Sequence, residues 1–140
     1  MIRKFEKNDI DKIMEIWLKT NTEAHSFIDK SYWESNYDMV KEMMPQAEIY
    51  VFEENKNILG FIGLMDNYIA GIFIEKNFQS KGIGKQLLDY VKRIKENLTL
   101  QVYEKNKKAV KFYKKENFVI QSEDIDKNIN EKEFVMYWKK

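Results

Sequence analysis

The stretch QSKGIG at residues 79–84 constrains the fold of this chain more than any other feature of its sequence. It holds two of the five glycines and lies between an apolar run that ends at Phe78 and an amphipathic segment that begins at Lys85. Because glycine has no Cβ atom, the backbone can turn sharply there and a ligand can come close to its N–H groups. The stretch therefore predicts a tight turn from a strand into a helix.

The same turn is suited to binding an anion. Its N–H groups would be the unpaired donors at the positive end of the helix, which suits a pyrophosphate, and Lys81 and Lys85 would add charge. A P-loop is excluded, because it needs Ser or Thr where Gln86 stands, and a dinucleotide fingerprint is weak, because it needs glycine where Leu87 stands. A glycine turn without a ligand remains open for this motif alone.

Hydrophobic periodicity predicts four helices and six strands. The helices are expected at 8–20, 31–44, 83–96 and 106–116, and the strands at 48–54, 58–65, 68–74, 98–103, 118–122 and 133–138. The nearly continuous apolar character of 58–65 and 68–74 predicts burial on both faces. An acidic loop is expected between the last two strands. The order ααβββαβαββ describes a single α+β domain, residues 1–140, with a mixed sheet.

Charge and cysteine content exclude several classes of function. There is no cysteine, so disulfides and thiolate chemistry are excluded, and no metal site is expected. Lys plus Arg (24) nearly balance Asp plus Glu (23), which predicts neither a nucleic-acid nor a membrane partner. Residues 79–115, however, include eleven basic and three acidic residues, which fits either solvated helix faces or a positive field around an anionic ligand. The N-terminus lacks an apolar signal core, so a cytoplasmic protein is the default expectation.

Two motifs in this chain resemble those of the GNAT superfamily of N-acetyltransferases, in its small bacterial single-domain form. QSKGIG matches the acetyl-CoA motif [Q/R]-x-x-G-x-[G/A], and the preceding GIFIEKNF resembles the family's bulged fourth strand. The segment 100–118 resembles a second signature, in which an Asn opens a helix and an F-Y pair follows. The usual Gly before the closing Phe118 is Asn117 here, a mild departure. The resemblance covers residues 45–140 best.

The resemblance implies a GNAT fold, a mixed and mostly antiparallel sheet flanked by about four helices, with acetyl-CoA as cosubstrate. It implies that the backbone of the bulged strand pairs with the pantetheine arm and polarises the thioester carbonyl. The cofactor-binding residues expected from it are Ile72, Phe73, Ile74, Gln79, Ser80, Lys81, Gly82, Ile83, Gly84, Lys85, Asn106 and Tyr113.

Acetyl transfer to an amine needs a neutral amine and a proton for the departing thiolate. The resemblance places Tyr113 beside the CoA sulfur as general acid, although packing against Phe112 could also explain it, just as helix capping could explain Asn106. The Glu that some relatives use as base is Gln101 here, so His25 is a candidate base, with water-mediated deprotonation as the alternative. The expected acceptor pocket comprises His25, Trp33, Tyr37 and Tyr68, with Asp66 a further candidate.

The function expected from the resemblance is acetyl-CoA-dependent N-acetylation of a primary amine, on either a small molecule or a peptide or protein lysine. Direct attack in a ternary complex is expected, because no cysteine can form an acyl-enzyme. A non-catalytic acyl-CoA-binding sensor is the main alternative, and a nucleotide-phosphate binder is a weaker one.

Overall fold

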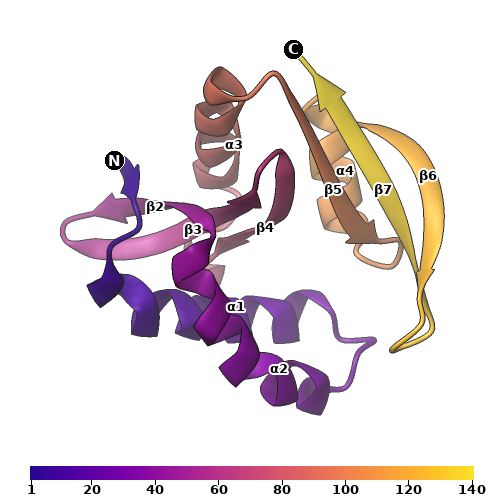
Figure 1. The fold of residues 1–140 in the computed structure, drawn as a ribbon, viewed down its shortest axis with the longest axis horizontal. Coiled ribbons are helices and arrows are strands. Elements are labelled where there is room, and N and C mark those ends of the chain that lie inside the picture. The colour runs from indigo at the N-terminus through magenta and orange to yellow at the C-terminus, as the bar shows by residue number, and fades with distance from the viewer.

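The computed structural model describes every residue from Met1 to Lys140 and contains one seven-stranded sheet (Figure 1). The strand order is β1-β2-β3-β4-β5-β7-β6, and every neighbouring pair is antiparallel except β4 and β5. The strands are β1 (Ile2–Lys4), β2 (Glu48–Glu54), β3 (Asn57–Met65), β4 (Tyr68–Ile74), β5 (Asn97–Tyr103), β6 (Val119–Asp126) and β7 (Glu131–Lys139). The predicted mixed, mostly antiparallel α+β architecture is confirmed.

Four α-helices flank the sheet, as predicted: α1 (Ile10–Ala24), α2 (Lys30–Met43), α3 (Ile83–Ile94) and α4 (Lys107–Lys115). Three short 3-10 turns accompany them: η1 (Lys7–Asp9), η2 (Met44–Gln46) and η3 (Lys76–Phe78). In Figure 1, α1 and α2 lie on one side of the sheet, and α3 and α4 lie on the other. None of these helices combines the length and the apolar character that a bilayer crossing would need.

The sheet has an apolar layer on each face because its strands alternate with a period of two. In β2, Ile49 and Val51 join the cluster beneath α1 and α2, whereas Tyr50 and Phe52 join the cluster beneath α3 and α4. The strand β3 is buried along its whole interior, as its apolar run predicts. This central strand therefore anchors both layers.

The prediction that β4 is buried on both faces is wrong. Only Ile69 of this strand is fully buried, and Ala70 is exposed. The cause is its pairing, because β4 and β5 are in register only at Tyr68 with Thr99 and Ile69 with Leu100. A bulge opposite Gly63 and Leu64 leaves Ala70 unpaired with β3 as well, and bulges re-aim the strand that carries them. Beyond it, β4 and β5 separate (Figure 1).

The acidic segment expected as a loop belongs mostly to β6. Glu123, Asp124 and Asp126 are paired with residues of β7, and only the turn at 127–130 separates the two strands. Charges suit this position because β6 is the exposed edge of the sheet, where they discourage pairing with another chain. The strand β1 was not predicted, since its three residues are too few to show a pattern.

Gly60 and Gly63 lie on the same strand but have very different surroundings. A Cβ on Gly60 would lie 2.7 Å from the carbonyl oxygen of Phe73 and 2.6 Å from Cδ1 of Ile74, so β4 would have to shift. We expect Gly60→Ala to lower the free energy of unfolding by about 1–3 kcal/mol, as overpacking does. Gly63→Ala is the matched control, because its nearest atom would be Cγ1 of Ile49 at 3.9 Å. Equal urea midpoints for the two variants would contradict this packing.

Candidate functional site

The turn from η3 into α3 exposes an unbroken row of backbone donors. Ser80 and Gly82 have φ angles of 62° and 85°, on either side of Lys81. No N–H group from Ser80 to Lys85 donates within the protein, and the next one, of Gln86, bonds to the carbonyl of Gly82 at 3.0 Å. Successive N–H groups in such a conformation form an anion-binding concavity, and here they coincide with a helix N-terminus.

The side chain of Gln79 holds this turn in place. Its Nε2 donates to the carbonyl of Ile74 at 2.9 Å, and its Oε1 accepts from Nζ of Lys108 at 3.3 Å. The amide therefore ties the end of β4 to α4 through the start of the turn. Gln79 was expected to bind cofactor, and its geometry is that of a group that positions the loop.

The two lysines of the turn differ in how available their charges are. Nζ of Lys85 lies 3.1 Å from Glu116 and 3.3 Å from Asp89, so two carboxylates already accompany it. Nζ of Lys81 lies over the ring of Phe78, 5.6 Å from its centroid, and has no carboxylate partner. An anion at this turn can therefore bind the ammonium group of Lys81, whereas Lys85 contributes mainly its backbone N–H group.

The strand β4, α3 and α4 meet at Gly84. A Cβ there would lie 3.7 Å from Cζ of Phe112 and 3.9 Å from Cγ2 of Ile72. The ring of Phe73 lies on the opposite face of the sheet, 4.9 Å from Phe61. The stretch from Ile72 to Ile74 pairs with β3 but has no strand on its other side, so its backbone edge stays available there except for the carbonyl of Ile74, which Gln79 uses.

Tyr113 lies in α4 with its ring between those of Phe112 and Phe118, at 5.3 and 5.5 Å. Burial, and secondarily the charge of Tyr68, raises the pKa of its phenol well above the ordinary value. The phenol is therefore protonated at neutral pH and remains a hydrogen-bond donor. Unlike the hydroxyl groups of Tyr68 and Tyr103, that of Tyr113 donates to no protein group. Both the packing role and the acid role expected of Tyr113 are compatible with this position.

Asn106 caps α4 and also contacts the only histidine. Its Oδ1 accepts the N–H of Ala109 at 3.3 Å, and its Nδ2 lies 3.2 Å from Nε2 of His25. Because the cap occupies Oδ1, the amide must donate to His25. That bond assigns the acceptor role to Nε2 and the hydrogen to Nδ1. The pair joins the end of α1 to the start of α4.

His25 is neutral in this structure. Burial lowers its pKa from 6.5 to about 4, and its one lone pair already accepts from Asn106. Nδ1 of His25 and Nε1 of Trp33 are the two buried side-chain polar atoms without a hydrogen-bond partner. The two rings are stacked with centroids 5.3 Å apart. As it stands, this imidazole is a weak base.

Two aromatic residues that were not predicted complete the surroundings of His25. The rings of Phe27 and Tyr103 meet it edge-on at 5.7 and 5.2 Å. The alternation of β5 places Tyr103 on the same face as Gln101, and that pattern was the available signal. The proximity of Phe27 depends on the loop after α1, for which the sequence has no pattern.

The other expected acceptor residues are spread over this side of the molecule. The hydroxyl of Tyr68 donates to Oε1 of Gln101 at 3.1 Å, across the junction of β4 and β5. Tyr37 packs on Trp17, with ring centroids 6.5 Å apart, rather than on His25. Asp66 is an exposed turn residue with a φ angle of 57°. The structure thus brings His25, Trp33 and Asn106 together and leaves Tyr37 and Asp66 with structural explanations.

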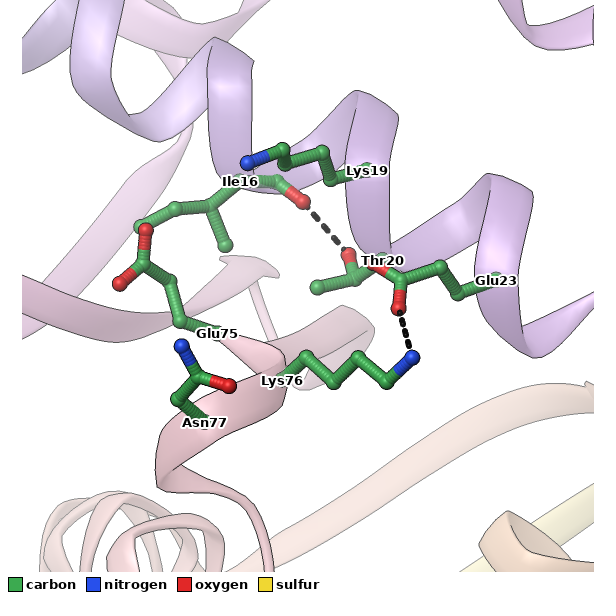
Figure 2. A pocket seen from close by; sticks show the side chains of 7 residues that line it. All are labelled: Ile16, Lys19, Thr20, Glu23, Glu75, Lys76 and Asn77. Atoms are coloured by element: carbon green, nitrogen blue, oxygen red, sulfur yellow. Dashed lines mark hydrogen bonds and ion pairs between the residues drawn. The ribbon is translucent and has the colours of Figure 1, made fainter.

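A cavity of about 200 Å³ lies elsewhere, between α1 and η3 (Figure 2). Its floor is tied by a hydrogen bond from Thr20 to the carbonyl of Ile16 at 2.7 Å, and Glu23 and Lys76 form an ion pair at 3.6 Å across it. Ligand pockets are commonly larger, at roughly 300–1,000 Å³. None of the expected site residues lines this cavity. The structure also brings no group of three or more His, Asp or Glu residues together that could hold a metal ion.

Comparisons with known proteins identify the family and the fold of this chain. A family model described as "Acetyltransferase (GNAT) domain" matches residues 18–132. The chain is 34% identical to the peptidyl-lysine N-acetyltransferase YiaC of Escherichia coli over 122 residues, covering 86% of this chain and 84% of that protein.

Solved structures are also similar to this chain. The solution structure of apo-form YjaB from Escherichia coli has a TM-score of 0.87 at 24% identity, covering 99% of this chain and 96% of that one. A PaiA N-acetyltransferase from Thermoplasma acidophilum, solved in complex with coenzyme A, has a TM-score of 0.84 at 20% identity, covering 100% and 98%. At these identities the likeness concerns the fold.

Because the pKa of His25 is lowered by folding, the free energy of unfolding should depend on pH. Since the pKa is about 4 in the folded state and 6.5 in the unfolded state, the unfolded chain binds more protons between these values. The contribution is fully present above pH 6.5 and is lost as pH falls toward 4. We expect acidification to destabilise the parent relative to His25→Gln by on the order of 2–3 kcal/mol, measured as urea unfolding at several pH values. If the free energies of unfolding of the two proteins change in parallel with pH, the pKa of His25 is not lowered by folding.

Proposed function

This chain belongs to the GNAT acetyltransferase family, and we propose that it transfers the acetyl group of acetyl-CoA to the side-chain amine of a lysine in a protein or peptide. The family match and the relative at 34% identity make it an N-acetyltransferase. The choice of a peptide lysine over a small amine is supported by the name of that relative, a peptidyl-lysine N-acetyltransferase.

The single observation that carries the proposal is the row of unpaired N–H groups from Ser80 to Lys85. Six consecutive donors without protein acceptors would be costly in a closed interior, and they are ready to receive the oxygens of a pyrophosphate. The ammonium group of Lys81 adds charge beside them. Gln79 holds the turn at the end of β4, so a phosphate bound there would place the rest of CoA along this strand.

The free edge of β4 suits the pantetheine arm. That arm carries two amides, and amides can add to an exposed sheet edge as another strand does. The backbone from Ile72 to Ile74 has no strand partner on the side that faces β5, where the two strands have already separated, and of its polar groups only the carbonyl of Ile74 is used, by Nε2 of Gln79. A backbone N–H of this edge would then polarise the thioester carbonyl as negative charge develops on it.

Tyr113 is suited to protonate the leaving thiolate. A thiol has a pKa of about 8.5 and would leave as an anion, whereas the raised pKa of this phenol keeps it protonated at neutral pH, so its hydroxyl group, which has no protein partner, can donate to the thiolate as it forms. The amine attacks the thioester carbon directly, since the chain has no cysteine to carry an acyl group. Asn106 helps to hold α4, and thus Tyr113, in place.

His25 fits a positioning role better than the base role expected from sequence. Its neutral ring and occupied Nε2 leave it little basicity, while its bond to Asn106 connects the loop after α1 to the helix that carries Tyr113. Trp33 and Tyr68 are the aromatic residues best placed to border the acceptor, beside His25 and Gln101 respectively.

An assay of free thiol release tests the proposal. We expect CoA to be released from acetyl-CoA when a lysine peptide is present, with mass spectrometry showing acetylation at the lysine side chain. Tyr113→Phe should lower kcat by about 100-fold, because a general acid contributes at least that much, with little change in acetyl-CoA affinity.

Tyr90→Phe is the matched control for this assay. Tyr90 packs against Tyr50 from α3, at a centroid distance of 4.9 Å, so its hydroxyl group can be removed without touching α4. The kcat of Tyr90→Phe should match that of the parent. If acetyl-CoA stabilises the protein against heat but no CoA thiol is released with any amine or peptide present, the protein is an acyl-CoA sensor instead. If ATP stabilises it and CoA does not, both the enzyme and the sensor are refuted.

A further inference from the structure

A half-buried carboxylate, that of Glu133, lies on the face of the sheet opposite α3 and α4, because it pairs with Tyr103, which packs against the cluster beneath α1 and α2. Glu133 stands directly across from Tyr103 on β5 and from Asp124 on β6. Because directly opposed residues project to the same side, its side chain shares a face with Tyr103 and Gln101. This face borders the point where β4 and β5 separate.

No cation accompanies this carboxylate. Lys132, its neighbour on β7, is paired with Glu123 and Glu104 at 2.7 and 3.6 Å, and Lys105 is paired with Glu131 at 3.1 Å. Glu133 itself takes part in no ion pair or hydrogen bond, whereas the equally acidic neighbours Glu123 and Glu131 are both neutralised. The structure thus leaves one partly buried negative charge unused.

The groups that face Glu133 do not compensate its negative charge. They are Tyr68 from β4, Tyr103 from β5, Tyr32 from α2, and Asp124 and Asp126 from β6. All are neutral or negative, and a like charge directly opposite, as Asp124 is, destabilises a strand pair. Burial, and secondarily Asp126 and Asp124, raises the pKa of Glu133 above its ordinary value.

The position of Glu133 relative to the free edge of β4 is also suitable. Glu133 shares a face of the sheet with Gln101, and Gln101 accepts a hydrogen bond at 3.1 Å from Tyr68, which lies on β4 where this strand begins to separate from β5. Tyr113 lies on the opposite, helix-covered face, packed between Phe112 and Phe118.

We propose that Glu133 is the general base of the acetyl transfer: its carboxylate binds the acceptor ammonium group and takes one proton from it. The inference rests on the proposed function and extends it to a residue that the sequence motifs do not mark. A lysine ammonium group has a pKa of about 10.4, so a base in the site supplies the neutral amine that attack requires.

The step balances without a further reactant. One N–H bond of the ammonium group breaks as an O–H bond forms on Glu133. The nitrogen lone pair then forms a C–N bond to the thioester carbon, and the C–S bond breaks. The thiolate takes the proton of Tyr113, the second proton lost from nitrogen restores that phenol through water, and Glu133 releases its proton to solvent.

The test is the pH dependence of kcat/KM for Glu133→Gln with a lysine peptide. We expect an approximately 100-fold loss at pH 7, because a positioned base contributes at least that factor. Between pH 6.5 and 9 the rate of the variant should climb about tenfold per pH unit, following the free-amine fraction, while the parent stays nearly flat. With an aminooxy peptide as acceptor, which is uncharged at neutral pH, the kcat/KM of Glu133→Gln should be no more than roughly threefold below that of the parent.

Matched variants separate a chemical role from a structural one. Glu123→Gln removes the same charge from neighbouring β6, where Lys132 now pairs with it, and should leave rate and profile unchanged. Glu133→Asp keeps a carboxylate and should keep the flat profile at a lower kcat. Glu133→Gln also relieves the opposition of Asp124, so its melting temperature should equal or exceed that of the parent.

Two outcomes would overturn the inference, and they are distinguishable. If the parent acetylates the peptide and Glu133→Gln shows a profile parallel to it, Glu133 is not the base and the proposed function stands. If the parent binds acetyl-CoA but acetylates no amine, the proposed function itself fails and the base role fails with it.

Discussion

The separation of β4 from β5 is the constraint on which this site depends. A parallel pair that continued beyond its two registered positions would use the N–H and C=O groups of β4 and would close the sheet. Because the bulge at Ala70 turns β4 away, the strand keeps an unpaired edge within an otherwise continuous sheet. The helices that follow β4 and β5 then present their N-terminal ends on one side of this opening.

The two sides of the opening have opposite chemical character. On the helix side, the turn from Ser80 to Lys85 presents donors to an anion, and Tyr113 holds a proton. On the other side, the carboxylate of Glu133 lies without a cationic partner opposite Asp124, and we propose that it receives the acceptor ammonium group. The proposed acetyl transfer uses this separation, with the anionic donor molecule on the helix side and the cationic acceptor on the side of Glu133.

Sequence reasoning succeeded where local chemistry determines local structure. The glycine turn, the cap at Asn106 and the helix that carries Tyr113 are all set by residues close together in the chain. It failed where long-range pairing decides. The exposure of β4 follows from a partner strand that leaves it, and the acidic segment became a strand because β7 pairs with it. Glu133 could not be recognised for the same reason, since its surroundings come from α2, β4, β5 and β6.

The most direct measurement is an amide chemical-shift titration of the ¹⁵N-labelled protein with coenzyme A. If the turn is the pyrophosphate site, the N–H resonances from Ser80 to Lys85 should show the largest shifts, followed by those of Ile72 to Ile74 along β4. Shifts centred on the cavity between α1 and η3, at Lys19, Thr20 and Asn77, with the turn unchanged, would contradict the account.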